Sequence, residues 1–301
     1  MTMKYYANLH THSLHSDGKY TPARLAQMAK EEGYGAVAVT DHDTATAYPE
    51  FKAECDRLGL ETIFGVEFSA PSSFKRPETG STVDFHIVGF HFDPEYPAMK
   101  EYLAGMSLRE ADQTRILVER GLREGLLKDI TWEEVVQFNK GITWLCNEHV
   151  FLLMEAKGLA VKADYPRFFD EVFGPRRSEV PPAYDFKPVD EMIRLIRDAG
   201  GIALVAHPHD QLQYLDALGE MGLEGLEACH FLLTPEERAL ALKLGMEKNL
   251  YISGGTDHEG YLGGSYESYP SPEESPFYVP SCAIGTTRTF FDEIKNKRLN
   301  R

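Results

Sequence analysis

Short apolar runs alternate with amphipathic helical segments along most of the chain, and this alternation limits the fold more than any other feature. The runs that resemble buried strands are YYANLH, GAVAVTDH, LETIFGVEF, VDFHIVGFH, GIALVAHP, LEGLEACH and LYISGGTDH. Segments such as TPARLAQMAKEEG and VDEMIRLIRDAG have the periodicity of amphipathic helices. Strands that alternate with helices in this way predict βαβ units and a parallel sheet or barrel.

The alternation is interrupted once. Between about residues 97 and 182 the sequence contains several helical patterns and no convincing strand, and the turn EVPPAY then returns the chain to the alternating region. We therefore predict an α/β domain made of residues 1–99 and 183–301, with a helical insertion of residues 100–182.

Composition narrows the classes of function. No apolar run approaches the roughly 20 residues that a membrane span requires, and the start, MTMKYYANLH, lacks the apolar stretch of a signal peptide. The 4 cysteines are scattered without a CxxC pair, which favours free thiols in a reducing compartment. We expect a cytoplasmic protein with no membrane partner, and the sequence leaves the oligomeric state open.

The chain is strongly acidic, with a formal net charge of −16. Such a charge disfavours broad electrostatic binding to nucleic acid, so no stable nucleic-acid partner is expected. An anionic substrate would need positive charge supplied locally, by bound metal or by a few arginines.

Polar residues at the ends of the apolar runs are the most informative feature for function. In parallel α/β folds the chemistry gathers at the carboxyl ends of the strands, so these residues should converge. His10 and His12 are two apart in an extended segment, so their side chains leave from the same face. Imidazole and carboxylate together suit Mn, Fe or Zn and a hydrolytic site. The strand-end residues are His10, His12, Asp41, His42, Glu67, His86, His207, Asp257, His258 and Glu259.

Each of these residues has an ordinary explanation when it is taken alone. A strand-end histidine such as His42 is often a capping or surface residue, and Asp17 before Gly18 is a common turn. Six strand ends that all carry such residues favour a shared site.

The ordered motifs HTHSLHSDG, VTDHD, GVEFS, HIVGF, VAHP and GGTDHEG resemble those of the PHP (polymerase and histidinol phosphatase) family, in particular its stand-alone metal-dependent phosphoesterases. The resemblance covers residues 5–95 and 183–260, and the family commonly carries a helical insertion between them. It implies a distorted barrel of seven β/α units that holds two to three divalent metal ions, Mn, Fe or Zn.

The resemblance also implies how the ligands are divided among the ions. The first ion would be bound by His10, His12, Glu67 and Asp257. Glu67 would bridge to a second ion held by His86 and His207, and the third would be held by Asp17 and His42. The family's last motif is usually Asp-x-His, whereas this chain has Asp257-His258-Glu259. Either Glu259 replaces the expected imidazole or a local shift presents His258.

Metal ions about 3.5 to 4 Å apart can activate water and neutralise developing charge without a side-chain nucleophile. Among the site residues, His207 or His209, together with Asp17 or Asp257, could orient the water or protonate the leaving group.

The insertion should cover the site, because it leaves the α/β domain at a strand end. Arg115 and His149 are our prediction for binding a second phosphate or distal group, since arginine binds phosphate bidentately. Arg109 and Arg120 fit a solvated helix face better. We interpret His15, His91 and His230 as structural.

The sequence thus predicts a metal-dependent phosphoesterase that acts on a small phosphorylated metabolite, such as a nucleotide or nucleoside bisphosphate. Histidinol-phosphate phosphatase and cyclic phosphodiesterase are the enzyme alternatives. A hypothesis of another class is a catalytically inert, metal-stabilised regulatory module, which the altered TDHEG motif favours. The many costly polar groups retained in one cleft argue against it.

Overall fold

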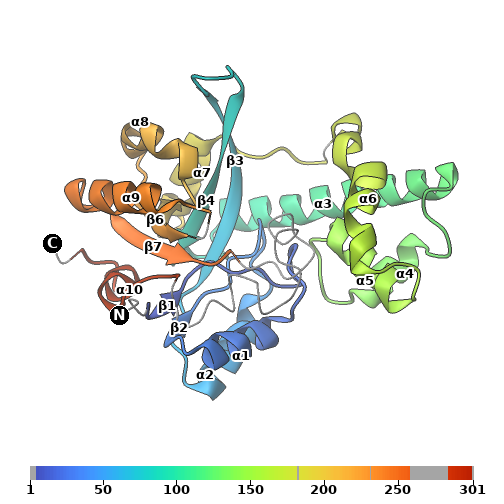
Figure 1. Cartoon of the computed structure of the whole chain (residues 1–301), viewed down its shortest axis with the longest axis horizontal. Helices are drawn as coiled ribbons and strands as arrows, with labels where there is room; N and C mark the ends of the chain where they lie inside the picture. The colour runs from blue at the N-terminus through green and yellow to red at the C-terminus, as the bar shows by residue number, and fades with distance from the viewer. Residues whose placement is uncertain (1–4, 182, 231, 258–283, 300–301) are drawn as a thin grey trace.

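The computed structural model describes residues 5–181, 183–230, 232–257 and 284–299. Its strands form two sheets that lie side by side (Figure 1). The smaller sheet is a parallel pair, β1 (Ala7–Asn8) and β2 (Ala36–Val37). The larger has five strands in the order β3 (Gly65–Lys75), β4 (Thr82–Phe90), β5 (Ile202–Val205), β6 (Gly225–His230) and β7 (Tyr251–Gly255).

The larger sheet is mixed, which corrects the prediction of a uniformly parallel sheet. Strands β5, β6 and β7 are parallel, but β4 runs antiparallel to both β3 and β5. The cause is the short connection of residues 76–81 between β3 and β4, which holds no helix and joins the strands as a hairpin.

Backbone hydrogen bonds join the two sheets. The amide of Leu9, just after β1, donates to the carbonyl of Gly254 in β7 at 3.2 Å. On the other side, the amide of Glu67 in β3 donates to the carbonyl of Thr40 at 3.1 Å. The described strands are assigned as two sheets and not as one closed barrel, yet these bonds bring their polar ends to one place.

Helices pack around the sheets where the sequence predicts amphipathic segments. In α7, the residues Val189, Met192, Ile193 and Ile196 form one buried face that packs in the main core. The side chain of Thr21 caps the start of α1 by accepting from the amide of Arg24. The helices of this domain are α1 (Pro22–Glu32), α2 (Tyr48–Leu58), α7 (Val189–Asp198), η4 (His209–Tyr214), α8 (Leu215–Glu220), α9 (Pro235–Glu247) and α10 (Arg288–Lys295).

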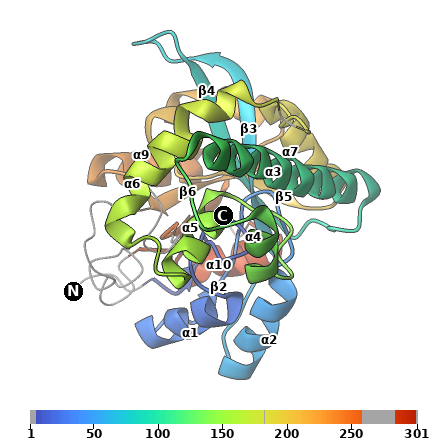
Figure 2. The same ribbon diagram turned by 90° about the vertical axis from the view of Figure 1, so that its right-hand side faces the viewer.

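The elements assigned between Pro97 and Glu179 are all helical. Figure 1 shows α3 extending to α4, α5 and α6 at one end of the molecule, and Figure 2 shows these helices on the side that faces the viewer. They are α3 (Pro97–Glu124), α4 (Trp132–Phe138), α5 (Asn147–Ala156), η1 (Lys162–Asp164), α6 (Tyr165–Phe168), the short π-helix η2 (Phe169–Phe173) and η3 (Gly174–Glu179). No helix in the described part of the chain is long and apolar enough to cross a membrane.

Helix α3 is shared between two cores. Its first half places Met99 and Tyr102 in the core of the α/β domain, whereas Leu117 and Val118 pack in a separate core formed by the insertion. The predicted boundary at residue 100 therefore falls within a continuous helix.

The second core predicts that the insertion can be destabilised separately. Phe151 is fully buried and packs against the rings of Tyr165 and Phe168, each at 5.1 Å between centroids. We expect Phe151→Ala to lower the free energy of unfolding by about 3 to 5 kcal/mol, because it leaves a cavity. Urea denaturation followed by circular dichroism measures this change. Phe138→Ala, at a side chain that is 48% exposed, should stay within about 0.5 kcal/mol, and equal losses would contradict the separate core.

Candidate metal centre

Four side chains from distant parts of the chain meet at the ends of β1, β3 and β7. His10, His12, Glu67 and Asp257 are buried, and each offers a nitrogen or oxygen atom within 4.8 Å of the others. His10 Nε2 lies 3.1 Å from Glu67 Oε2, and His12 Nε2 lies 2.9 Å from Asp257 Oδ1. These atoms converge closely enough to bind one ion.

Glu67 is the centre of the cluster. Its Oε2 atom lies 3.1 to 3.4 Å from nitrogens of His10, His12 and His42. Its Oε1 atom lies 3.0 Å from His86 Nδ1 and 3.0 Å from His207 Nε2. One carboxylate thus contacts five imidazoles, which is the geometry of a bridging ligand.

Three further groups of possible ligands adjoin the first, and one of them consists of His10, Glu227 and His230. The other two are made of residues that the sequence predicts as ligands. His42, Glu67 and His86 form one, and His12, Asp17 and His42 form the other, each with ligand atoms within 4.8 Å of one another. The structure therefore brings together the predicted ligands His10, His12, Asp17, His42, Glu67, His86, His207 and Asp257. The other two, His258 and Glu259, lie outside the described residues.

Burial and opposite charges shift the pKa values in this cluster. Burial raises the pKa of Glu67, but the nearby imidazoles of His10 and His42 outweigh it and hold that pKa well below the usual range. Burial lowers the pKa of His10, but the carboxylates of Glu67, Glu227 and Asp257 raise it well above 6.5. Without metal, protons on histidine balance the buried carboxylates.

The donor set fits divalent metal ions. His42 Nδ1 and Glu67 Oε2 are buried without a hydrogen-bond partner, and His10 Nε2 faces His12 Nε2 at 3.1 Å. Buried polar atoms normally have partners, so converging lone pairs of this kind fit a bound cation. Imidazole and carboxylate ligands suit Mn, Fe or Zn.

The backbone holds these side chains in unusual conformations. His207 and Asp257 have positive φ values of 27° and 52°, which non-glycine residues rarely adopt. The amide of Asp257 donates to the carbonyl of His10 at 2.9 Å, so the ends of β1 and β7 are fixed to each other. Gly18 is required beside the first strand, because a Cβ atom there would lie 2.3 Å from the carbonyl oxygen of His12.

Asp41, a strand-end residue that the sequence grouped with the ligands, supports the first motif. Its carboxylate accepts hydrogen bonds from the amide and hydroxyl of Ser13, at 2.6 and 2.7 Å, and from the hydroxyl of Ser16 at 2.7 Å. These bonds fix the loop that carries Asp17.

Strand β6 contributes two residues that the sequence analysis did not assign to the site. Glu227 is buried, and its Oε1 atom lies 3.0 Å from His10 Nδ1 while its Oε2 atom accepts from the amide of His207 at 2.8 Å. His230, interpreted as structural, lies 3.5 Å from Asp257 through Nε2 and Oδ2. A register shift between Glu227 and Cys229 brings both side chains to one side. The sequence LEGLEACH did contain an indication of this, because the predicted strand carries a glutamate and ends in a histidine, as other strands of the site do.

The predicted substrate-binding residues lie elsewhere. Arg115 is on the outer surface of α3, paired with Asp112 at 2.9 Å and Glu119 at 3.0 Å. His149 is fully buried: its Nε2 donates to the carbonyl of Leu14 at 2.7 Å, and its Nδ1 accepts from the amide of Cys146 at 3.0 Å. Neither side chain occupies the substrate-facing position predicted for it.

Burial lowers the pKa of His149 to about 4, so its imidazole is neutral and fastens the insertion to the first motif. His209, also predicted to bind substrate, is half exposed, and its Nδ1 lies 3.5 Å from Glu237 Oε1.

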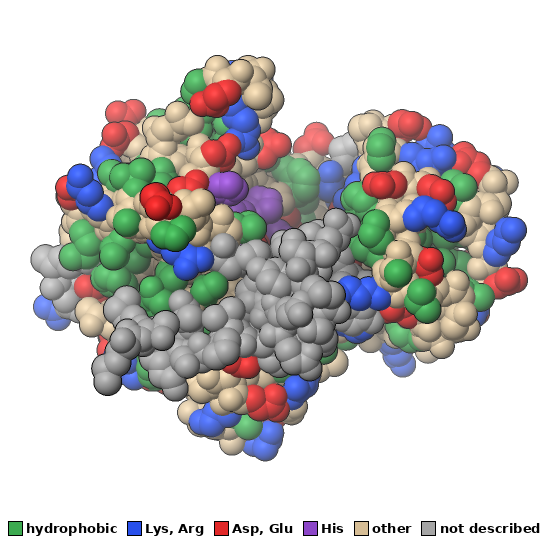
Figure 3. Space-filling view, viewed as in Figure 1, with side chains coloured by type: hydrophobic (Ala, Val, Ile, Leu, Met, Phe, Trp, Pro, Cys, Tyr) green, Lys and Arg blue, Asp and Glu red, His purple; other side chains and the backbone are tan. Residues whose placement is uncertain are grey.

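The cluster opens into a hollow between the α/β domain and the insertion, where Figure 3 shows the histidines at the surface. His10 and His12 are inaccessible, whereas the side chains of His86, Asp17 and His207 are 36%, 22% and 17% exposed. Access to the metal centre is therefore past His86, Asp17 and His207.

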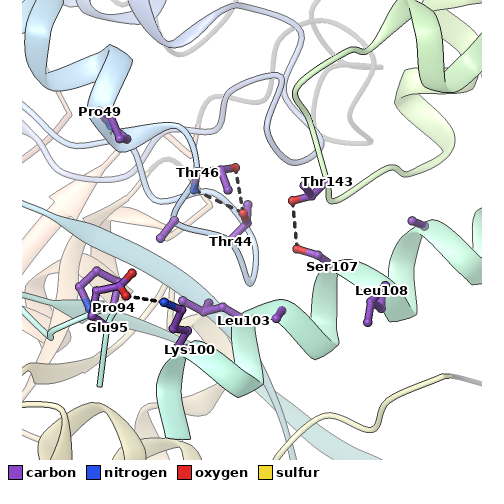
Figure 4. Close-up of a pocket in the computed structure, with 13 residues that line it drawn as sticks. Thr44, Thr46, Pro49, Pro94, Glu95, Lys100, Leu103, Ser107, Leu108 and Thr143 are labelled. Carbon is purple, nitrogen blue, oxygen red and sulfur yellow. Dashed lines mark hydrogen bonds and ion pairs between the residues drawn. The ribbon is translucent and has the colours of Figure 1, made fainter. Parts of the chain in front are cut away.

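A separate cavity of about 790 Å³ lies between α3 and the loop after β2 (Figure 4). Its wall is mainly apolar, and its polar groups pair with each other: Thr143 donates to Ser107 at 3.3 Å, and Lys100 pairs with Glu95. None of the predicted metal ligands lines it.

Glu227 should determine the metal affinity of the cluster through His10. A carboxylate accepts both from His10 Nδ1–H and from the His207 amide, whereas the amide of Glu227→Gln can accept on one side only. We expect Glu227→Gln to weaken metal binding about 10- to 100-fold, measured as metal content after dialysis against graded free Mn²⁺. The control is Glu224→Gln, because Glu224 pairs with Arg197 outside the cluster. Equal metal affinity in the two variants would show that Glu227 has no such role.

Metal binding should release protons. In the metal-free protein, neighbouring carboxylates overcome the effect of burial and raise the pKa values of His10, His12 and His86 above 6.5, so protons compete with metal at neutral pH. The apparent affinity should rise with pH, by about tenfold per pH unit for each proton displaced, until these groups lose their protons. Calorimetry with Mn²⁺ in buffers of different ionisation enthalpy counts the protons, and a heat independent of buffer would contradict the expectation.

Comparison with known proteins finds similarity to one domain family and to several enzymes. A profile of the PHP domain matches residues 8–155. The 5'-3' exoribonuclease Rnm of Salmonella typhimurium is 29% identical over 83% of this chain and 84% of its own. The phosphoribosyl 1,2-cyclic phosphate 1,2-diphosphodiesterase of Eggerthella lenta is 26% identical over 85% of this chain and 95% of its own. The 3',5'-nucleoside bisphosphate phosphatase of Chromobacterium violaceum is 28% identical over 83% of this chain and 86% of its own.

A solved structure from Bifidobacterium adolescentis has the same fold. It superposes on 100% of this chain and 99% of its own with a TM-score of 0.74, at 24% identity. The resemblance predicted from the ordered motifs is confirmed: residues 8–155 match the PHP domain, and over most of its length the chain is similar to enzymes named for the cleavage of phosphate esters.

Proposed function

We propose that this chain is a metal-dependent phosphoesterase that releases phosphate from a small phosphorylated metabolite, with a nucleotide or nucleoside bisphosphate as the substrate class. The observation that carries the proposal is the buried Glu67 carboxylate, which contacts five imidazoles, two of which, His86 and His207, are partly exposed. The relatives that cleave phosphate esters support the same chemistry.

Bound divalent ions would supply Lewis acidity and activate water at this site. Two to three ions, Mn, Fe or Zn, fit the adjoining groups of ligands, in which His10, His12, Glu67 and Asp257 hold the innermost ion. His86 and His207 would share Glu67 with the second, and Asp17 and His42 would hold the third.

His207 and Asp17 are the groups that we propose for proton transfer. Both are partly exposed to the hollow, so each can reach a water molecule or a leaving group as well as a metal ion. Asp257 is nearly covered and is held by the His12 and His230 imidazoles, which suits a ligand better than a mobile proton carrier.

The fold that we propose is one distorted seven-stranded barrel with residues 100–182 as a cap over the substrate. The bonds from Leu9 to Gly254 and from Glu67 to Thr40 support it, because they join the two sheets on both sides. The contact between the Trp144 ring and His42, 6.4 Å between centroids, supports the cap.

A second candidate function is exonucleolytic removal of nucleotides from the 5' end of RNA. The relative named as a 5'-3' exoribonuclease favours it, because it is 29% identical over 83% of the chain. The net charge of −16 favours a small substrate instead, since extended contact with an RNA backbone requires broad positive charge.

Phosphate release from a substrate panel tests the proposal. The panel consists of nucleoside monophosphates, nucleoside 3',5'-bisphosphates, cyclic phosphates, histidinol phosphate and a 5'-phosphorylated oligoribonucleotide, with protein loaded with Mn²⁺. We expect turnover of a nucleotide or bisphosphate that falls at least about 1000-fold in His10→Ala, because a buried metal ligand is lost.

His15→Ala is the matched control from the same motif. His15 bonds Thr46 at 2.7 Å and lies outside the cluster, so its removal should change turnover by less than about threefold. Processive release of mononucleotides from the oligoribonucleotide alone would favour the exonuclease. No turnover of any substrate by metal-loaded protein would favour the inert regulatory module.

A further inference from the structure

We propose that Trp144, on the loop before α5 of the insertion, positions the imidazole of His42 for the third metal ion, so that the insertion controls whether that ion is bound. The inference rests on the division of ligands in the proposed function, in which Asp17 and His42 hold the third ion. Trp144 acts through His42 and is therefore a positioning residue.

The indole ring of Trp144 lies nearly parallel to the ring of His42. The two centroids are 6.4 Å apart and the planes differ by 26°, within the range of about 4.5 to 7 Å over which offset aromatic rings attract each other. Trp144 is 8% exposed, and its Nε1 atom is buried without a hydrogen-bond partner. Packing therefore holds the indole, and the face of the ring is what it offers to His42.

His42 lacks the kind of hydrogen bond that orients His10. A histidine that binds metal through one nitrogen usually donates a hydrogen bond from the other, which fixes the ring. His10 has such a partner in Glu227, at 3.0 Å from its Nδ1. In His42, Nδ1 lies 3.4 Å from Glu67 Oε2 without a hydrogen bond, and Nε2 lies 3.6 Å from Asp17 Oδ2. Both nitrogens of His42 face other possible ligands, so contacts on the ring itself must orient it.

Neighbouring rings supply those contacts. The rings of His12 and His86 lie 4.6 and 5.2 Å from the ring of His42 between centroids, and both residues are predicted metal ligands. Among the ring contacts of His42 that the structure describes, Trp144 is the one that comes from the insertion. An indole does not bind a divalent ion, so its contribution there is to restrict the movement of the imidazole.

The same part of the insertion holds the loop of Asp17, the second ligand of the third ion. Cys146 Sγ donates to the carbonyl of Ser16 at 3.5 Å, and His149 Nε2 donates to the carbonyl of Leu14 at 2.7 Å. The insertion therefore contacts both segments that carry ligands of the third ion.

The first ion does not depend on the insertion in this way. His10 is oriented by Glu227 in β6, and the amide of Glu67 donates to the carbonyl of Thr40, so bonds within the α/β domain hold both ligands. The side chain of His42 is 14% exposed, whereas those of His10 and Glu67 are inaccessible. We expect the third ion to bind last and to be the ion that a movement of the insertion releases.

Stepwise binding of Mn²⁺ to metal-free protein tests the inference, because electron paramagnetic resonance measures the free ion while fluorescence reports on Trp144. The chain has 2 tryptophans, and the other, Trp132, packs against the core of the insertion. In a Trp132→Phe background we expect the emission of Trp144 to change only when the last ion binds, since His42 holds that ion. Asp17→Ala, which removes the other ligand, should abolish this change.

Trp144→Ala is the informative variant. We expect the affinity for the last ion to fall at least about tenfold, while the affinity for the first ion changes less than about threefold. Trp144→Phe keeps an aromatic face over His42 and should restore the affinity to within about threefold of the wild-type value. Trp132→Phe is the matched control and should leave every binding step unchanged. If circular dichroism shows that Trp144→Ala has lost helix, Trp144→Leu takes its place, because leucine keeps apolar packing without an aromatic ring.

The outcomes separate this inference from the proposed function. An unchanged last step in Trp144→Ala, an equal loss of affinity for every ion, or wild-type protein that binds no third ion at saturation would overturn the inference. The titration does not require turnover, so a chain that cleaves no substrate but shows the selective loss keeps the role of Trp144 and loses only the proposed reaction. Phosphate release together with equal metal affinity in wild type and Trp144→Ala keeps the proposed function and removes the role of Trp144.

Discussion

The buried carboxylate of Glu67 is the interaction on which the rest of the structure depends. An ionised carboxylate that loses all contact with water costs several kcal/mol unless opposite charge surrounds it. Here the compensation comes from imidazoles on segments far apart in sequence, such as His10 and His207. Each of those imidazoles can reach Glu67 only if its strand ends at the same edge. The metal centre and the arrangement of strands therefore depend on each other.

Around Glu67, a second set of buried carboxylates orients the imidazoles. Glu227 contacts His10 Nδ1 and the amide of His207, so one side chain determines a tautomer and supports a backbone with positive φ. Asp41 instead holds the loop that precedes Asp17, by accepting hydrogen bonds from Ser13 and Ser16. This division explains why the chain places more acids near the centre than the ions need as ligands: ligating histidines require a partner for their other nitrogen.

The sequence was sufficient for features that local patterns encode. Apolar runs located the strands, and the polar residues that end them located the centre. Features that depend on how distant segments pack were not visible. The apolar pattern of VDFHIVGFH would be the same in a parallel or an antiparallel strand. The antiparallel direction of β4 follows only from the hairpin that joins it to β3. The register shift in β6, which turns Glu227 and His230 to one side, leaves no mark in LEGLEACH.

Helix α3 fixes the position of the insertion relative to the metal centre. It is continuous from Pro97 to Glu124 and packs in both cores, so its axis sets the position of the insertion relative to the α/β domain. At the junction, Gly105 allows close packing, because a Cβ atom there would lie 2.6 Å from the ring of Tyr184. His149 fastens the far side of the insertion to the carbonyl of Leu14, beside the first motif. With both sides attached, the position of the insertion beside the metal centre is fixed by contacts that are present before any substrate binds.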